Sequence, residues 1–244
     1  MKRLLIKIKY DGTAYHGYQV QDNALTVQEV FQNAVEKVFQ KRLDVIGCSR
    51  TDSGVHANMY CLCLDTDMNI SNEGVILALN TYLPNDIAVF DCTEVPQDFH
   101  PRYNCKSKEY LYVIFNGKYR NPFYDRYAYW YRYDLDEKYL DREAKAYVGK
   151  YDYSGFCSSK SDVEDTVREI YSFDVWREGD LVFFKVSGDG FLYNMVRIMV
   201  GTLLFVSQGK IKENELKSVI DSKDRKRAGR TAPPQGLYLN KIVY

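Results

Sequence analysis

The chain has 244 residues, of which 45% are hydrophobic and 27% are charged, and its 33 Lys and Arg are balanced by 33 Asp and Glu. It is too apolar to be disordered, and its 15 Gly and 6 Pro are too few for a fibrous chain. The length allows one large domain or two of about 100–120 residues. A net charge of zero excludes neither nucleic acid nor other partners, because the basic excess lies in residues 106–244 and can form a basic face there.

The start of the chain does not look like a targeting segment. MKRLLIKIKYDGT begins basic but soon alternates polar and apolar residues, without the apolar core or cleavage site of a signal peptide. No stretch approaches the roughly 20 apolar residues of a membrane span. Six scattered cysteines predict free, buried thiols in a reducing compartment. We therefore expect a soluble, cytoplasmic protein without membrane contact.

The first half predicts short strands and two helices. Alternating residues predict a strand over 5–10, and Thr26 with Glu29 forms a capping box that opens an amphipathic helix over 27–38. Further along, the pattern predicts strands over 43–47, 59–64 and 87–92, and a helix over 74–82 that Pro84 stops.

The second half repeats this mixture. Strands are predicted over 110–115, 126–133, 170–175, 182–186 and 237–243, and helices over 137–148, 192–207 and 212–221. In the strand over 126–133, four of the 22 tyrosines would share one face: Tyr127, Tyr129, Tyr131 and Tyr133. Because strands and helices do not alternate regularly, we predict an α+β fold of two halves, 1–105 and 106–244, with a boundary near 104–108.

The densest polar cluster is the loop Arg50-Thr51-Asp52-Ser53-Gly54-Val55-His56. A carboxylate between a cation and small turn-forming residues can be directed into a cleft as a nucleophile. The alternative is an Asx-turn, in which Asp52 only accepts backbone hydrogen bonds.

Arg197 lies in FLYNMVRIMVGTLLF, a helix that is apolar on nearly every face and is therefore predicted to be buried. A buried guanidinium needs a carboxylate partner, because an unpaired buried charge is strongly destabilising. The alternative is a side chain that lies along apolar surface with its charged end in water. We favour the pairing, because the helix offers so little polar surface.

Two further features have both functional and ordinary explanations. Tyr110 and Tyr112 share a strand face, so one of them can line a cleft, although a lone strand tyrosine is more often a core residue. The run KDRKRAGR over 223–230 suits phosphate contacts, or it is a solvated surface.

Several familiar sites are missing from the sequence. It contains no Walker loop and no dinucleotide fingerprint. Cys48, Cys61, Cys63 and His56 lack the paired spacing of a metal site, and buried thiols explain the cysteines better. We expect no metal and no cofactor.

Five ordered motifs resemble the TruA family of tRNA pseudouridine synthases, from residue 4 to residue 243. They are YDGTAYHGYQVQ with the following TVQ, SRTDSGVHA, FHPRYNCKSKEYLY, FLYNMVRIMVG and TAPPQGLYL. The resemblance implies that Asp52 is the catalytic nucleophile, that Tyr110 is the active-site tyrosine, and that Arg197 pairs with Asp52. Attack on the uracil ring and attack on the ribose carbon both stay open.

The resemblance also implies substrate-binding residues. Arg50 would hold the place of a nucleotide flipped out of the RNA, and Leu237 would lie close to the bound base. His56 and Arg102, in the same motifs, are expected to bind substrate. The family pattern differs here at Cys48-Ser49, Tyr18, Pro101 and 107–109, positions that bear on RNA affinity and loop geometry rather than on Asp52, Tyr110 or Arg197.

The implied reaction is isomerisation of uridine to pseudouridine on the 3′ side of the tRNA anticodon stem-loop, without metal, redox change or group donor. The implied fold is two similar α+β halves that share a continuous, mainly antiparallel sheet, in a homodimer with a basic cleft. Two alternatives remain: a non-catalytic RNA-binding protein with a tyrosine-rich sheet, and a small-metabolite hydrolase that uses Asp52.

Overall fold

The computed structural model describes residues 1–158 and 165–244. The chain divides into two compact units, which we call unit 1 (1–106 with 238–244) and unit 2 (107–237). The expectation of two consecutive halves, 1–105 and 106–244, is therefore wrong for the last seven residues, 238–244. They belong to unit 1 because their strand hydrogen-bonds to a strand of that unit.

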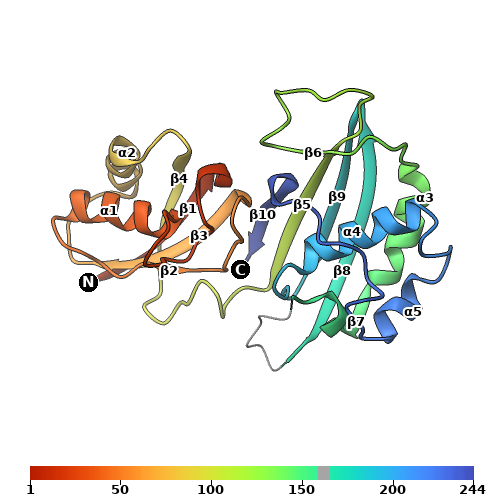
Figure 1. Cartoon of the computed structure of the whole chain (residues 1–244). Coiled ribbons are helices and arrows are strands. Elements are labelled where there is room, and N and C mark those ends of the chain that lie inside the picture. The colour runs from red at the N-terminus through yellow and green to blue at the C-terminus, as the bar shows by residue number, and fades with distance from the viewer. Residues whose placement is uncertain (159–164) are drawn as a thin grey trace. The chain divides into compact units, whose positions relative to one another are not determined.

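Unit 1 is built on a mainly antiparallel sheet with the strand order β4-β1-β3-β10. Its strands are β1 (Lys2–Tyr10), β2 (Ile46–Gly47), β3 (His56–Thr66), β4 (Ile87–Val95) and β10 (Leu237–Val243). β1 lies between β3 and β4, antiparallel to both, and β2 pairs with β3. β10 runs parallel to β3, with Tyr238 opposite His56, and Figure 1 shows it beside β3 although it is far away in the sequence.

Two helices, α1 (Val27–Phe39) and α2 (Asn72–Tyr82), pack on one face of this sheet (Figure 1). Each begins at a side-chain cap. The Thr26 hydroxyl accepts from the Glu29 N–H, and the Ser71 hydroxyl accepts from the Gly74 N–H. The predicted start of the first helix is therefore confirmed.

Within unit 2, antiparallel strands pair in the order β5-β9-β8-β7, and β6 runs parallel to β5. The strands of this unit are β5 (Ser107–Phe115), β6 (Tyr129–Trp130), β7 (Gly149–Asp152), β8 (Val167–Glu178) and β9 (Leu181–Gly188). The helices α3 (Glu137–Ala144), α4 (Met195–Ser207) and α5 (Leu216–Asp221) cover one face (Figure 1). Short 3-10 turns occur at Gly12–Ala14 in unit 1 and at Lys145–Tyr147, Ser154–Phe156 and Pro234–Gly236 in unit 2.

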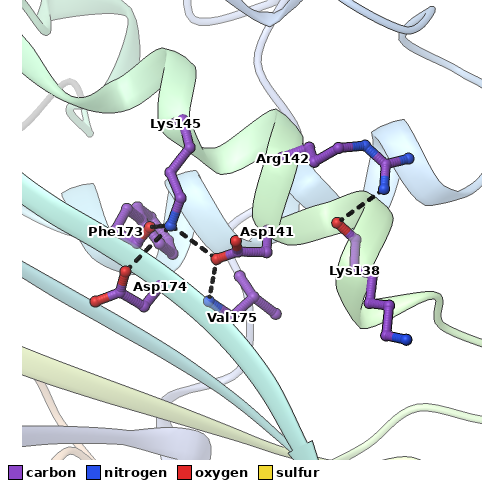
Figure 2. Close-up of polar contacts among 7 residues, drawn as sticks. All are labelled: Lys138, Asp141, Arg142, Lys145, Phe173, Asp174 and Val175. Carbon is purple, nitrogen blue, oxygen red and sulfur yellow. Dashed lines mark hydrogen bonds and ion pairs between the residues drawn. The ribbon is translucent and has the colours of Figure 1, made fainter.

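The end of α3 is tied to β8 by a small charged network (Figure 2). Asp141 accepts from the backbone N–H of Val175 at 2.8 Å and from Lys145 at 2.8 Å. Lys145 also donates to the Phe173 carbonyl at 2.7 Å and to Asp174 at 3.1 Å. These groups are partly exposed, so the network fixes the position of α3 more than it stabilises the fold.

The α+β fold class is confirmed, and two predicted strands are shorter than expected: the strand over 43–47 is only Ile46–Gly47, and the strand over 126–133 is only Tyr129–Trp130. The Asn116 amide donates to the carbonyls of Tyr131 and Tyr133, replacing sheet bonds there. The predicted helix over 212–221 begins at Leu216, and β7 was not predicted. The expectation of one sheet shared by both units stays a prediction.

None of the six cysteines forms a disulfide. Cys48, Cys61, Cys63 and Cys92 are buried, as predicted, whereas Cys105 and Cys157 are only half-buried, contrary to the prediction. Burial raises the pKa of the Cys61 and Cys92 thiols to about 11. Within the described residues, no helix is long and apolar enough to cross a membrane.

Candidate active-site residues in the two units

Asp52 lies in the loop 48–55, which connects β2 to β3 in unit 1. Its side chain is half-buried, whereas Arg50 is exposed and Thr51 is 8% exposed. The loop therefore offers one carboxylate and one guanidinium at its surface and turns the residue between them inward. This arrangement suits a group that must meet a ligand from a fixed position.

A second segment, 11–18, supports this loop from within unit 1. The Tyr18 N–H donates to the Thr51 carbonyl at 3.2 Å, and the Gly54 N–H donates to the Tyr15 carbonyl at 3.1 Å. Gly17 has a φ of +87°, and a Cβ there would lie 2.5 Å from the Thr51 oxygen. The approach of the two backbones therefore requires glycine. This support of the Asp52 loop gives the motif YDGTAYHGYQ a structural role.

His56 is 1% exposed and lies at the end of the loop, where β3 begins. Its Nδ1 accepts from the Gly12 N–H at 3.0 Å and lies 3.2 Å from Asp11 Oδ1, and its ring stacks on Tyr238 at 4.8 Å. Because Nδ1 accepts a hydrogen bond, the proton of the neutral ring is on Nε2. Substrate binding by His56 stays a prediction. The contacts described here anchor the end of the loop.

Arg197 lies on α4 in unit 2, where ten of the thirteen residues are buried, as predicted for this helix. The side chain itself is half-buried. Its Nε donates to the Ala232 carbonyl at 2.7 Å, and its Nη1 donates to Asn194 Oδ1 at 2.6 Å. The Ala232 N–H returns a bond to the Arg197 carbonyl at 3.0 Å. The predicted pairing with Asp52, which belongs to unit 1, stays a prediction.

Asn194 was not singled out from the sequence. It is the N-cap of α4 and adopts a left-handed conformation with a φ of 62°. Its side chain does not cap the helix; instead Oδ1 accepts from Arg197, and Nδ2 donates to the Ser158 hydroxyl at 2.9 Å. Its place three residues before Arg197, on the same side of one helical turn, is the sequence signal that could have found it.

Tyr110 is 7% exposed on β5, and its ring meets the edge of Phe191 at 5.1 Å. Tyr112, on the same face, is fully buried, and its hydroxyl donates to the Pro233 carbonyl at 2.7 Å. Burial raises the pKa of Tyr112 well above its ordinary value. The Tyr112 hydroxyl is therefore engaged inside the unit, and the active-site role of Tyr110 stays a prediction.

Other predicted binding residues differ in exposure. Leu237 is 5% exposed, whereas Arg102 is exposed, with its guanidinium 5.9 Å from the Tyr103 ring centre. The roles of both residues in substrate binding stay predictions.

The basic run 223–230 is used partly within unit 2 itself. Lys223 pairs with Asp152 at 2.9 Å, and Arg225 donates to the Gly229 carbonyl at 2.8 Å. In the described part of the chain, the side chains of Lys226 and Arg230 have no polar partner, and both residues are exposed. These two side chains are the ones best suited to phosphate contacts.

The described residues contain no group of three His, Cys, Asp or Glu side chains that could hold a metal ion.

Comparison with known proteins gives one consistent result. A family model described as tRNA pseudouridine synthase matches residues 6–104 and 144–244. tRNA pseudouridine synthase A of Thermoanaerobacter sp. (strain X514) is 44% identical over 244 residues, covering 100% of both chains, and that of Clostridium acetobutylicum is 43% identical with the same coverage.

Among solved structures, a Cbf5–Nop10–Gar1 complex covers 96% of this chain and 57% of that chain, at 11% identity and a TM-score of 0.40. That likeness is too low to bear on function. The full-length matches are decisive: the chain belongs to the family of tRNA pseudouridine synthases, which are isomerases.

Proposed function

We propose that this protein converts uridine to pseudouridine on the 3′ side of the tRNA anticodon stem-loop, with Asp52 as the nucleophile. The observation that carries the proposal is the half-buried Asp52 carboxylate, in a loop that the segment 11–18 supports on both sides of it. Membership of the family supports the reaction class. The target within the tRNA and the role of Asp52 are the parts that need testing.

The chemistry breaks one bond and forms another. The uracil nitrogen leaves the ribose carbon, the base rotates, and its carbon-5 joins the ribose; the proton on carbon-5 is lost and the released nitrogen gains one. A base in a helix must first be flipped out, which costs a few kcal/mol. The exposed Arg50 would fill the vacated place in the stack. Tyr110 would stack on the uracil, and a cation such as Arg197 beside Asp52 would favour its ionised form.

The protein would act as a homodimer in the cytoplasm and grip tRNA through phosphates. The side chains of Lys226 and Arg230, exposed and without polar partners in the described residues, support this part of the proposal. Because such contacts release counterions, tRNA affinity should fall steeply as salt rises, in spite of the zero net charge.

Asp52→Asn tests the proposal directly. The amide can accept hydrogen bonds but is a poor nucleophile, so the variant should fold and bind tRNA yet make no detectable pseudouridine. The measurement is pseudouridine mapping in tRNA from cells that lack the protein and are complemented with each variant. Asp67→Asn, a change of an exposed carboxylate in the same unit, is the control and should restore the modification. Pseudouridine made by Asp52→Asn would overturn the role of Asp52, and pseudouridine restored only elsewhere in tRNA would overturn the target.

A thermodynamic cycle tests the pairing of Asp52 with Arg197. Both side chains are half-buried, and removing one member of such a pair is destabilising because the other charge is left without its partner. If the two are partners, the Asp52→Asn, Arg197→Met double variant should be less unstable than the sum of the single variants. Strict additivity, together with an active Arg197→Met enzyme, would contradict the pairing.

A further inference from the structure

Two buried tyrosines, Tyr10 and Tyr60, lie beneath the Asp52 loop, residues 48–55. Neither of them is among the proposed catalytic or substrate-binding residues. Tyr10 is the last residue of β1 and is 4% exposed, and Tyr60 is on the adjacent strand β3 and is fully buried. Their ring centres are 5.9 Å apart. Neither ring is available to a substrate, so any part they play must be exerted through the residues that they hold.

Each hydroxyl holds one residue of the loop. The Tyr60 hydroxyl donates to the Ser49 carbonyl at 2.5 Å, and the Tyr10 hydroxyl is hydrogen-bonded to the Thr51 hydroxyl at 2.8 Å. Ser49 and Thr51 are the two neighbours of Arg50, and Thr51 precedes Asp52. The two bonds therefore fix the backbone on both sides of the exposed arginine and directly before the candidate nucleophile.

We infer that Tyr10 and Tyr60 are positioning residues for pseudouridine formation, which act by holding residues 49–51 so that Arg50 and Asp52 keep a fixed geometry. This inference rests on the proposed roles of Asp52 and Arg50. Loop residues lack the repeated hydrogen bonds of a helix or sheet, so individual side-chain bonds set their positions. A displacement of about 1 Å at a reacting group can cost on the order of 100-fold in rate.

The tyrosines are well suited to this task because they cannot move or ionise easily. The Tyr18 ring stacks on the Tyr60 ring with their centres 4.2 Å apart, and Tyr60 is fully buried on β3. Burial raises the pKa of Tyr60 well above its ordinary value, so its hydroxyl remains a donor at any working pH. The sequence departs from the family pattern at Tyr18 and at Cys48-Ser49, and both departures adjoin Tyr60.

A purely structural role would give a different result, and the chain offers a matched control. Tyr153 in unit 2 is also fully buried, and its hydroxyl donates to the backbone carbonyl of Tyr147. Tyr60→Phe and Tyr153→Phe therefore remove the same kind of bond, one beneath the Asp52 loop and one far from it in the chain. Both should lower the melting temperature by a similar amount.

The experiment measures kcat, KM and melting temperature for the purified full-length variants with tRNA as substrate. Tyr60→Phe and Tyr10→Phe should lower kcat about 10-fold or more while the folded fraction at the assay temperature stays complete. Tyr153→Phe should keep kcat within about twofold of the unmodified protein. If both loop variants keep full kcat, or if Tyr153→Phe loses as much kcat as they do, the inference is wrong.

The hydrogen bond between Tyr10 and Thr51 allows a second, independent test. Thr51→Val removes the hydroxyl at nearly constant volume, and adding it to Tyr10→Phe should lower kcat no further, because the bond is already absent. Thr51→Ser should restore most of the activity. If the kcat losses of Tyr10→Phe and Thr51→Val multiply in the double variant, the bond between them does not have this role. Asp52→Asn, assayed alongside, separates the two hypotheses. If Asp52→Asn is active, the proposed function is wrong. If Asp52→Asn is inactive while Tyr60→Phe is fully active, only this inference is wrong.

Discussion

The residues proposed for chemistry are held in two different ways in the two units. Asp52 lies in an irregular loop whose position depends on separate hydrogen bonds from segment 11–18 and from Tyr10 and Tyr60. Arg197 lies on α4, a helix with ten of its thirteen residues buried, and its guanidinium donates to Asn194 and to the Ala232 carbonyl within unit 2.

The difference explains why the motifs of the two units look different. A loop has no repeating bonds of its own, so its support comes from residues dispersed along the sequence, as in YDGTAYHGYQ. A buried helix satisfies its own backbone, so one short motif, FLYNMVR, contains both Arg197, which we propose to be functional, and its hydrogen-bond partner Asn194. A change near Asp52 should therefore affect activity first, whereas a change near Arg197 should affect stability as well.

The largest effect on stability is expected from Gly201→Ala, which adds a methyl group where α4 closely approaches the backbone of Arg230. A Cβ at Gly201 would lie 1.7 Å from the Arg230 carbonyl oxygen, so backbone must move in Gly201→Ala. We expect a loss of about 3 kcal/mol in the free energy of unfolding, measured by urea denaturation. Gly190→Ala, where the nearest atom is a flexible Arg168 side-chain atom at 3.4 Å, is the control and should change stability by less than about 0.5 kcal/mol.

Gly12→Ala is the counterpart in unit 1, because a Cβ there would lie 2.0 Å from the Val55 carbonyl oxygen, next to the Asp52 loop. We expect its kcat to fall by more than the loss of folded protein would cause. The measurement is kcat on protein that is shown to be folded. Equal stability loss in Gly12→Ala and Gly201→Ala with kcat preserved in both would remove the contrast between the units.

The next effect concerns the partner of Arg197. Asn194→Gly keeps the left-handed backbone but removes the acceptor for Nη1, whereas Asn194→Asp keeps an acceptor there. Because a charged group loses a hydrogen bond, Asn194→Gly should cost about 2 kcal/mol in stability and lower kcat, and Asn194→Asp should recover most of both. Equal kcat in the two variants would show that Asn194 does not orient Arg197.

Acid should weaken both units through one carboxylate in each. Arg3 lowers the pKa of Asp65 in unit 1, and the Thr166 hydroxyl and Lys223 lower the pKa of Asp152 in unit 2, both from an ordinary value of 3.8. Since the folded pKa is the lower one, the ionised carboxylates stabilise the fold above about pH 4, and this stabilisation is lost as the pH falls towards the folded pKa. Asp152→Asn should therefore cost about 1–2 kcal/mol at pH 7 and less at pH 3. A cost that grows at pH 3 would contradict this linkage.

The smallest expected effect is a gain in the stability of the protein. The Tyr18 hydroxyl is the one buried side-chain polar atom that lacks a hydrogen-bond partner in the described part of the chain. Removing it in Tyr18→Phe should stabilise the protein by about 1 kcal/mol, because an unsatisfied buried group carries a desolvation cost. Tyr60→Phe, which removes a bonded hydroxyl from the ring stacked on Tyr18, is the opposite control and should destabilise. Destabilisation in both variants would mean that the Tyr18 hydroxyl has a hydrogen-bonding role.

Local patterns predicted much of this molecule. The Thr26 cap, the buried helix around Arg197 and the exposed turn around Asp52 all follow from short stretches of sequence. The roles of Tyr10, Gly12, Tyr60 and Asn194 did not, because each depends on contacts that only the folded chain creates. The tyrosine-rich stretch 126–133 alternates like a strand, yet Asn116 takes the carbonyls that a neighbouring strand would need. The predicted common face of the tyrosines is wrong as well, because Tyr131 is buried whereas Tyr127 and Tyr133 are exposed. A periodic pattern alone does not show which backbone groups are available for a sheet.

The position of β10 has a consequence for how the protein is made. Unit 1 needs residues 238–244, and the ribosome reaches them only after it has synthesised all of unit 2. At roughly 5–20 residues per second, that interval is on the order of ten seconds. Throughout it, β3 lacks the partner that pairs with His56 and Ala57, and His56 lacks the Tyr238 ring on which it stacks. Unit 2 is one continuous segment and can fold while the nascent chain is still attached, so the Asp52 loop gains its final support last, and enzymatic competence arises late in the life of the nascent chain.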